Sequence, residues 1–238
     1  MKRAFLNLRL TKSDRVEMFA RGLRLNGYKV IPGVTMDPRP QDILVTWNRI
    51  GTGAGAARAF EAVGLPVLVA ENATWGNGFA GDRWYHIARN RHNTAGMFPV
   101  GGPERWDSLG VKLAPWRTEG ETVILAQRGI GSPPTAMPRD WPNQAKIRHG
   151  GRIRNHPGKT PARALEADLA KAGKVVTWGS GAAIQALQWG IPVVSEMPNW
   201  IGEQSNTTEM RLEMFRRLAW AQWNHSEISQ GVPFRALL

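Results

Sequence analysis

The chain has 238 residues, of which 31 are Lys or Arg and 19 are Asp or Glu, and it contains no cysteine. This length allows one large domain or two small ones. The lack of cysteine excludes disulfides, thiolate metal ligands and a cysteine nucleophile, and it is typical of a reducing compartment. No segment approaches the ~20 apolar residues that span a bilayer, and the first 15 residues lack the apolar run of a signal peptide. We therefore expect a soluble, cytoplasmic protein with no membrane partner.

The formal net charge of +12 is spread over both halves of the chain. Such a surface attracts polyanions, including nucleic acid and anionic glycans, and also anionic small substrates. Eleven tryptophans accompany this charge, and several lie in loop-like sequence. An exposed Trp can stack on bases or sugars, whereas a buried one fills a core. We expect Trp75 and Trp84 to contact an acceptor, with core packing as the alternative for each.

Strands and helices alternate over the first 71 residues. The helices are recognised by apolar positions that recur every three to four residues and by the glycines that end them, and the strands by short apolar runs. Such alternation is typical of a parallel sheet with helical crossovers. The expected strands are residues 3–9, 28–33, 42–47 and 65–71, and the expected helices are residues 13–26 and 53–64.

The pattern is interrupted between residues 72 and 117, which are rich in Gly, Asn, His and Trp and show little periodicity. Long loops inside compact domains are usually functional. We therefore predict a substrate-facing segment here, with a short helix near residues 83–90.

The alternation restarts after residue 120, and Pro233 is expected to close the ordered part. The predicted fold class is α/β, with two small Rossmann-like halves and parallel sheets. The acceptor side is assigned to residues 1–117 and the nucleotide-sugar side to residues 118–238. The expected strands are 121–127, 174–178 and 191–197, the helices are 161–173, 179–190 and 207–223, and 139–160 is a basic, irregular stretch.

The strongest candidate for a ligand site is the turn between the strand at 174–178 and the helix at 179–190. The first amides of a helix lack partners and point outward at the positive end of the helix dipole. Gly179 and Gly181 allow a ligand to approach the backbone, and the Ser180 hydroxyl adds a donor. This arrangement suits a phosphate or diphosphate. Ser180 acting only as a helix N-cap is the alternative.

Four segments of the second half resemble GT-B glycosyltransferases. The first is the strand followed by Ser180, an Ala-rich helix and GIPVV at 190–194. The others are RNHPGK at 154–159, QRGIG at 127–131, and the closing segment 217–231. The chain is similar to capsule-polysaccharide-biosynthesis glycosyltransferases and to small bacteriophage-encoded relatives that modify DNA. GT-B enzymes are usually longer, so this chain corresponds to a trimmed version whose acceptor half matches only weakly.

The resemblance implies that the second half binds a nucleotide-sugar donor, a UDP-sugar in the first instance and a CMP-sugar as the alternative. By position, the phosphates fall to Arg128, Arg154 and His156, together with the start of the helix. The full set of implied donor-site residues is Arg128, Gly129, Arg154, His156, Thr177, Ser180 and Gly181.

A glycosyltransferase without a covalent intermediate needs one general base for the acceptor hydroxyl and groups that stabilise the leaving diphosphate. Open α/β sheets bind ligands at the carboxyl ends of their strands. Glu71 ends the predicted strand 65–71 and is our first candidate, with Asp82 second and His92 third. Glu71 capping a neighbouring backbone is the alternative. No metal is expected, because the sequence has no HExxH, no cysteine and no Asp-x-Asp.

The basic surface and the loop tryptophans favour a hydroxylated DNA base as the acceptor, reached after the base leaves the stack. A glycan or glycolipid acceptor, a non-catalytic nucleic-acid-binding protein and a nucleotide-sugar epimerase remain as alternatives. For the densest basic stretch, a solvated surface loop is the alternative. The residues predicted to contact the acceptor or DNA are Arg49, Trp75, Arg83, Trp84, His92, Lys146, Arg148 and Arg152.

Overall fold

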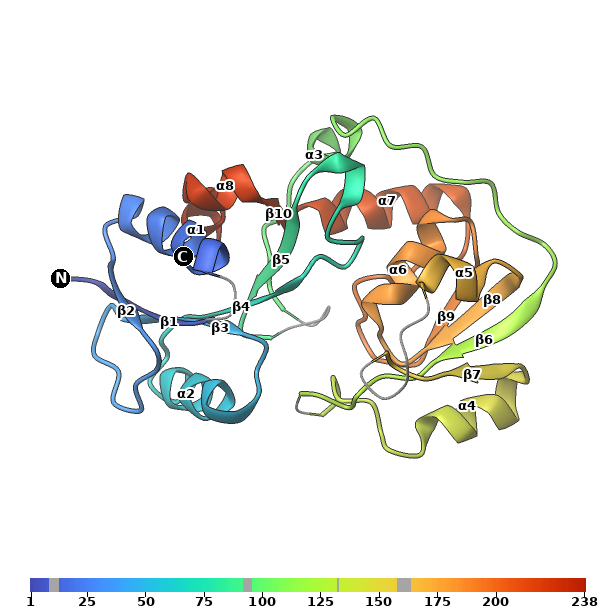
Figure 1. Ribbon diagram of the computed structural model, residues 1–238, viewed down its shortest axis with the longest axis horizontal. Helices are drawn as coiled ribbons and strands as arrows, with labels where there is room; N and C mark the ends of the chain where they lie inside the picture. The colour runs from blue at the N-terminus through green and yellow to red at the C-terminus, as the bar shows by residue number, and fades with distance from the viewer. Residues whose placement is uncertain (9–12, 92–95, 132, 158–163) are drawn as a thin grey trace.

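The structure is a computed structural model that describes all residues except 9–12, 92–95, 132 and 158–163. It contains two β-sheets, one at each end of the molecule (Figure 1). The six-stranded sheet has the order β10-β5-β4-β3-β1-β2, and the four-stranded sheet has the order β7-β6-β8-β9. Helices cover both faces of each sheet, so the predicted α/β class with two Rossmann-like halves is confirmed.

The first sheet is mixed, because four parallel strands are extended by two antiparallel ones. The helix expected near residues 83–90 is instead the strand β5, which pairs with β4 through the register Glu71↔His86. Nearly every residue of β5 is buried, so pairing inside the sheet decides its conformation. The strands are β1 (Arg3–Asn7), β2 (Lys29–Pro32), β3 (Ile43–Trp47), β4 (Val67–Asn72), β5 (Trp84–Arg89) and β10 (Gln222–Asn224).

Alternate side chains of these strands enter two different cores, as the two-residue period of a strand requires. Phe5, Leu44 and Val67 pack against α2 (Gly51–Ala62) on one face. The opposite face packs against α1 (Ser13–Leu25) and two helices from the far end of the chain. Figure 1 shows α1 and α8 on one side of this sheet and α2 on the other. The two distant helices are α8 (His225–Ser229) and α9 (Val232–Leu237).

The C-terminal segment therefore returns to the first sheet after α7 (Thr208–Ala219). The helix expected over 207–223 is present as α7 but ends at Ala219, because residues 222–224 form β10. The expected end of order at Pro233 is wrong, since this residue lies within α9. Residues 222–224 pair with β5 in the first sheet, although they follow the second half in sequence. Trp223 is buried there, because removing its apolar ring from water is favourable.

The second sheet is wholly parallel. The basic stretch 139–160, expected to be irregular, contains the helix α4 and the strand β7. Trp141 and Ala145 lie one turn apart on α4 and pack under Ile124 and Val176, which anchors the helix. The elements are β6 (Glu121–Leu125), β7 (Arg152–Arg154), β8 (Ala172–Thr177), β9 (Val193–Ser195), α4 (Trp141–His149), α5 (Leu165–Leu169) and α6 (Gly181–Gln188).

The segment 72–117 is packed rather than open. Trp75 stacks on Phe79 with ring centroids 4.6 Å apart and meets Trp84 edge-on at 5.0 Å. Trp106 lies 4.6 Å from Phe215 of α7, so this aromatic cluster joins the segment to the second half. The expectation that Trp75 and Trp84 contact an acceptor is wrong, because both rings are buried. Two short helices, η1 (Phe79–Gly81) and α3 (Glu104–Asp107), lie within this segment.

Replacing Trp223 by Ala tests the return of the C-terminal segment. We expect the free energy of unfolding to fall by about 3–5 kcal/mol, because the change removes a buried ring and leaves a cavity. Urea denaturation measures it. Arg235→Ala is the control, since this exposed side chain lies on α9 of the same segment, and its effect should stay within about 0.5 kcal/mol. Equal effects of the two changes would contradict the packing described here.

Candidate functional site

A cavity of about 380 Å³ lies between the two sheets, at the carboxyl ends of their parallel strands. Ligands bind at this edge in open α/β folds, because the connecting loops and helix starts converge there. Both halves contribute to its wall. The first half supplies Trp47, Asn48 and residues 71–74, and the second half supplies residues 125–128, Ile130, Arg154, His156, Pro157, Leu165, residues 180–182 and Gln185.

The start of α6 lines the cavity on the side of the second half. The Ser180 Oγ accepts a hydrogen bond from the Ala182 amide at 3.2 Å, so Ser180 is an N-cap. Thr177 Oγ1 accepts from the Ser180 amide at 2.9 Å, and Gln127 Oε1 accepts from the Gly179 amide at 3.1 Å. Among the described residues, none accepts from the Gly181 amide. An anion at this helix start would therefore bind Gly181 first.

Thr74 brings the first half close to this helix start. A methyl group added to Gly181 would lie 3.6 Å from Thr74, at van der Waals distance. The Thr74 amide donates to Gln222 Oε1 at 3.1 Å, and Gln222 Nε2 lies 2.9 Å from His86 Nδ1. All three side chains are buried. The cavity wall at Thr74 is therefore held by the returning strand β10 and by β5.

Cationic side chains line the opposite side of the helix start. Arg154 ends β7, and its Nε donates to Asp168 Oδ2 of α5 at 2.6 Å. Its side chain is only 11% exposed, so this ion pair holds the guanidinium in one orientation. Arg128 is exposed in the turn after β6, and His156 is partly buried in the loop after β7. Three nitrogen-bearing side chains therefore face one cavity, as a diphosphate would require.

Glu71 is the penultimate residue of β4, lies on the other side of the same cavity and is partly buried. The first half thus places a carboxylate opposite the start of α6, where Ser180 and Gly181 lie. Asp82, the second candidate base, is exposed after η1 and does not line this cavity; its Oδ1 accepts from the Arg83 amide at 2.6 Å. His92 lies outside the described residues. Glu71 remains the predicted base.

Two other implied donor-site residues act on the backbone of the site. Thr177 is fully buried and holds the turn through its bond to the Ser180 amide. Gly129 adopts a φ of 67°, which favours glycine, between Arg128 and Ile130 of the cavity wall. Neither contributes a side chain to the cavity wall, so both shape the site.

The predicted acceptor arginines are dispersed, and carboxylates hold most of them. Lys146 is exposed on α4, away from the cavity. Arg49 lines a second cavity, where it pairs with Glu61 at 2.7 Å. The ion pairs that hold the others are Arg83–Asp14 at 2.6 Å, Arg148–Glu196, and Arg152–Glu121 at 3.0 Å.

Sequence reasoning missed two glutamines of the cavity. Gln127 follows the buried strand β6 and holds the Gly179 amide. Gln185 lies one turn into α6 and lines the cavity near Gly76. A polar residue just after a buried strand was the available signal for Gln127, whereas Gln185 shares α6 with Gln188 and had no distinguishing signal.

The described part of the chain shows neither a metal-binding cluster nor a membrane-spanning helix. No group of three or more Asp, Glu or His side chains there could hold a metal ion. In the same residues, no helix is both long and apolar enough to cross a bilayer.

No protein-family model and no curated protein sequence matches the chain. Among solved structures, it is similar to the Thermosulfurimonas dismutans KpsC beta Kdo 2,7 transferase, with a TM-score of 0.55 and 12% identity over 99% of this chain and 100% of that chain. It is also similar to the beta Kdo 2,4 transferase of KpsC from the same organism, with a TM-score of 0.57 and 14% identity over 95% of this chain and 98% of that chain. At these identities the likeness shows the fold alone, an α/β fold with two Rossmann-like halves that the chain shares with these two structures.

Glu196 provides a pH-dependent test of how α4 is held against the second half, because Trp141, Arg148 and His149 of this helix contact its carboxylate. Burial raises the pKa of Glu196, but hydrogen bonds from Arg148, His149 and Trp141 outweigh it and leave the pKa below its ordinary value. The carboxylate therefore stabilises the folded protein above the unfolded pKa of about 4.3. This contribution is lost as the pH falls through the lower folded pKa.

We expect Glu196→Gln to lower the free energy of unfolding at neutral pH, and the difference from wild type to shrink as the solution is acidified below about pH 4.3. Urea denaturation at a series of pH values measures this. Glu121→Gln is the control, because its pair with Arg152 is exposed and should contribute little. A Glu196→Gln difference that does not change with pH would contradict the assigned role of the carboxylate.

Proposed function

We propose that this protein is a glycosyltransferase that moves a sugar from a nucleotide donor to a hydroxyl group of a glycan. One observation carries the proposal. Glu71 from the first half, and Arg128, Arg154, His156 and the start of α6 from the second, line one cavity. The fold likeness to two Kdo transferases supports the same reaction class.

In this proposal the second half binds the nucleotide sugar. The Gly181 amide and the positive end of α6 bind one phosphate of the donor. Arg128 and Arg154 bind the donor phosphates through charge-assisted hydrogen bonds. Asp168 keeps Arg154 oriented, so little side-chain entropy is lost on binding. Because the sequence has an excess of Lys and Arg, long-range attraction also favours an anionic donor.

The reaction then needs a base on the first half. The Glu71 carboxylate takes the proton of the acceptor hydroxyl while the hydroxyl oxygen forms a bond to the anomeric carbon of the donor. The bond from that carbon to the phosphate oxygen breaks, and its electron pair stays on the nucleotide. Arg128, Arg154 and the Gly181 amide stabilise this developing negative charge, which gives them their largest effect in the transition state.

A glycan acceptor agrees better with the contacts than DNA does. The tryptophans that would have stacked on a base, Trp75 and Trp84, are buried. Arg83, Arg148 and Arg152 are paired with carboxylates and lie apart from the cavity. The observation that still favours DNA is the net charge of +12. Transfer of sugar to duplex DNA carrying a hydroxylated base, with no transfer to glycans, would replace the glycan proposal.

The donor site can be tested without knowing the acceptor. We expect one of the UDP-, GDP-, CMP- or ADP-sugars to raise the melting temperature, because a ligand that binds only the native state stabilises it by mass action. Ser180→Asp should abolish this rise, since Asp is a good N-cap but its charge repels the donor phosphates.

Ser180→Asn is the matched control, because Asn caps a helix equally well without a charge. Its apparent stability without ligand should equal that of Ser180→Asp, while it keeps a measurable response to the nucleotide. If both variants respond as wild type does, the start of α6 is not the phosphate site. The absence of a response to every donor in the wild type would contradict the proposed reaction.

Glu71→Gln tests the base. With the donor identified above and a panel of oligosaccharide acceptors, we expect kcat to fall by about 10²–10⁴-fold. The affinity for the donor nucleotide, measured by titration calorimetry, should be unchanged. Asp82→Asn is the control, since this carboxylate lies outside the cavity. A larger loss of kcat in Asp82→Asn than in Glu71→Gln would transfer the base to the second candidate.

A further inference from the structure

A second cavity of about 610 Å³ opens on the first half beside the proposed donor site. Four arginines line it, Arg49, Arg58, Arg89 and Arg91, against one carboxylate, Glu61, and we call it the arginine cavity. The formal excess is three positive charges. Its residues come from the two ends of α2, from the end of β5 and from the loop after it, with Gly131 of the second half at the rim.

Only one of these arginines is neutralised by a carboxylate. Both terminal nitrogens of Arg49 pair with the Glu61 carboxylate at 2.7 Å. Within the described part of the chain, no ion pair joins Arg58, Arg89 or Arg91 to a carboxylate, and the remaining residues contain no Asp or Glu. The Arg89 Nε is buried and has no hydrogen-bond partner among the described residues. The cavity therefore concentrates uncompensated donors.

This pattern is unusual for the chain, whose other arginines at helix and strand ends are mostly paired. Arg83, Arg105, Arg148, Arg152, Arg154 and Arg216 each contact a carboxylate. Like charges held together raise the free energy of the empty cavity, and a bound anion lowers it by charge-assisted hydrogen bonds. Salt screens the attraction between a bound anion and a partly buried arginine less than it screens an exposed ion pair.

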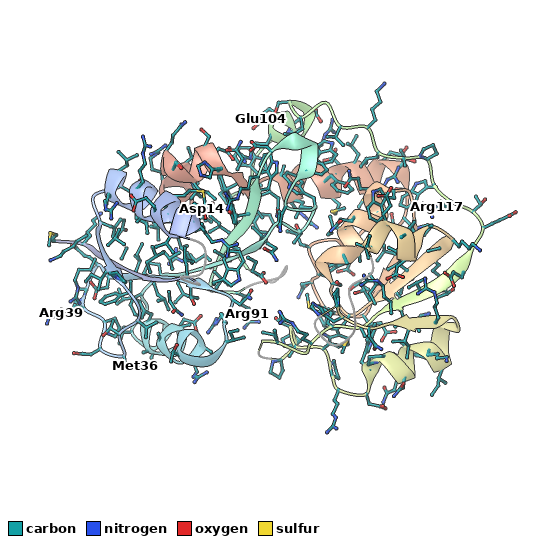
Figure 2. The ribbon with its side chains drawn as sticks, in the orientation of Figure 1. Asp14, Met36, Arg39, Arg91, Glu104 and Arg117 are labelled. Carbon is teal, nitrogen blue, oxygen red and sulfur yellow. The ribbon has the colours of Figure 1, made fainter. Side chains whose placement is uncertain are left out.

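The arginine cavity adjoins the donor-site cavity through neighbouring residues of both the first and the second half. Asn48 lines the donor-site cavity and Arg49 the arginine cavity, and the same holds for Ile130 and Gly131 across the gap. Figure 2 shows Arg91 on the side of the first half that faces the second. A molecule that presents its hydroxyl near Glu71 can thus extend from one cavity into the other.

We propose that the arginine cavity binds an acidic group of the acceptor, so that the acceptor is an acidic saccharide carrying carboxylates or phosphates. The proposal rests on the proposed glycosyltransferase function and identifies its acceptor class. The volume lies within the range of pockets that enclose small ligands, of about 300–1,000 Å³, which fits one or two sugar units. Arg58 and Arg91 are exposed and bind the acidic group directly, while Glu61 holds Arg49 in place.

The test uses the full chain with the donor nucleotide present at saturation. Titration calorimetry measures the affinity for tetragalacturonate, for neutral maltotetraose and for inorganic phosphate. We expect tetragalacturonate to bind and maltotetraose not to bind, and phosphate to compete with tetragalacturonate if the cavity accepts either anion. The double variant Arg58→Ala/Arg91→Ala should weaken tetragalacturonate binding by about tenfold or more, since two charged hydrogen-bonding groups are lost.

The double variant Arg21→Ala/Arg235→Ala is the control, because it removes the same net charge from exposed sites outside both cavities. It should leave the affinity for tetragalacturonate unchanged. Equal weakening in both double variants, or equal binding of the neutral and acidic saccharides, overturns the proposal. So does a short single-stranded DNA that binds more tightly than tetragalacturonate and depends on Arg58 and Arg91.

Nucleotide binding separates this proposal from the one on which it rests. If the nucleotide binds wild type and both double variants equally, the donor site stands whatever the saccharides do. If no nucleotide binds while tetragalacturonate still depends on Arg58 and Arg91, the arginine cavity is an acidic-saccharide site and the transferase proposal fails.

Discussion

The contact between aromatic rings of the segment 72–117 and α7 holds the two halves in one geometry. Trp106 packs on Phe215, and Trp75 stacks on Phe79 within the same cluster. Trp75 directly follows Thr74, which faces the start of α6. Burial of large rings contributes several kcal/mol at each site, far more than an exposed ion pair. The width of the cavity between the halves therefore depends on this cluster, and the polar site residues are positioned by it.

Arginine has two different uses in this protein. Most arginines of the described residues near element ends pair with carboxylates and join elements, as Arg105 does with Glu227 and Arg154 with Asp168. Each such pair cancels one charge of each sign, so pairing leaves the net charge of +12 unchanged. Among the arginines that form no ion pair in the described part of the chain, Arg128 lines the donor-site cavity and Arg58 the arginine cavity, and both are exposed. Arginines that line a cavity suit a small anionic ligand.

The parallel strands and the helix start were predictable because they depend on local pattern. Apolar runs such as residues 42–47 and 174–178 have one low-energy use, a buried strand, and Ser180 after such a strand caps the helix that follows. Residues 83–90 and 139–160 were mispredicted because pairing with β4 and packing under β6 decide their conformation. Long-range contacts of this kind are invisible to periodicity.

The sequence by itself determined the fold class, the strand–turn–helix at Ser180 and the candidate Glu71 at the end of an expected strand, whereas Arg128, Arg154 and His156 were candidates only through the family resemblance. Only the tertiary structure decided that these residues share one cavity. It also returned residues 222–237 to the first sheet, buried the tryptophans and gathered Arg49, Arg58, Arg89 and Arg91 from distant elements. The physical reason is that hydrophobic burial is non-directional and acts between segments far apart in sequence, so the chain order does not reveal which segments it joins.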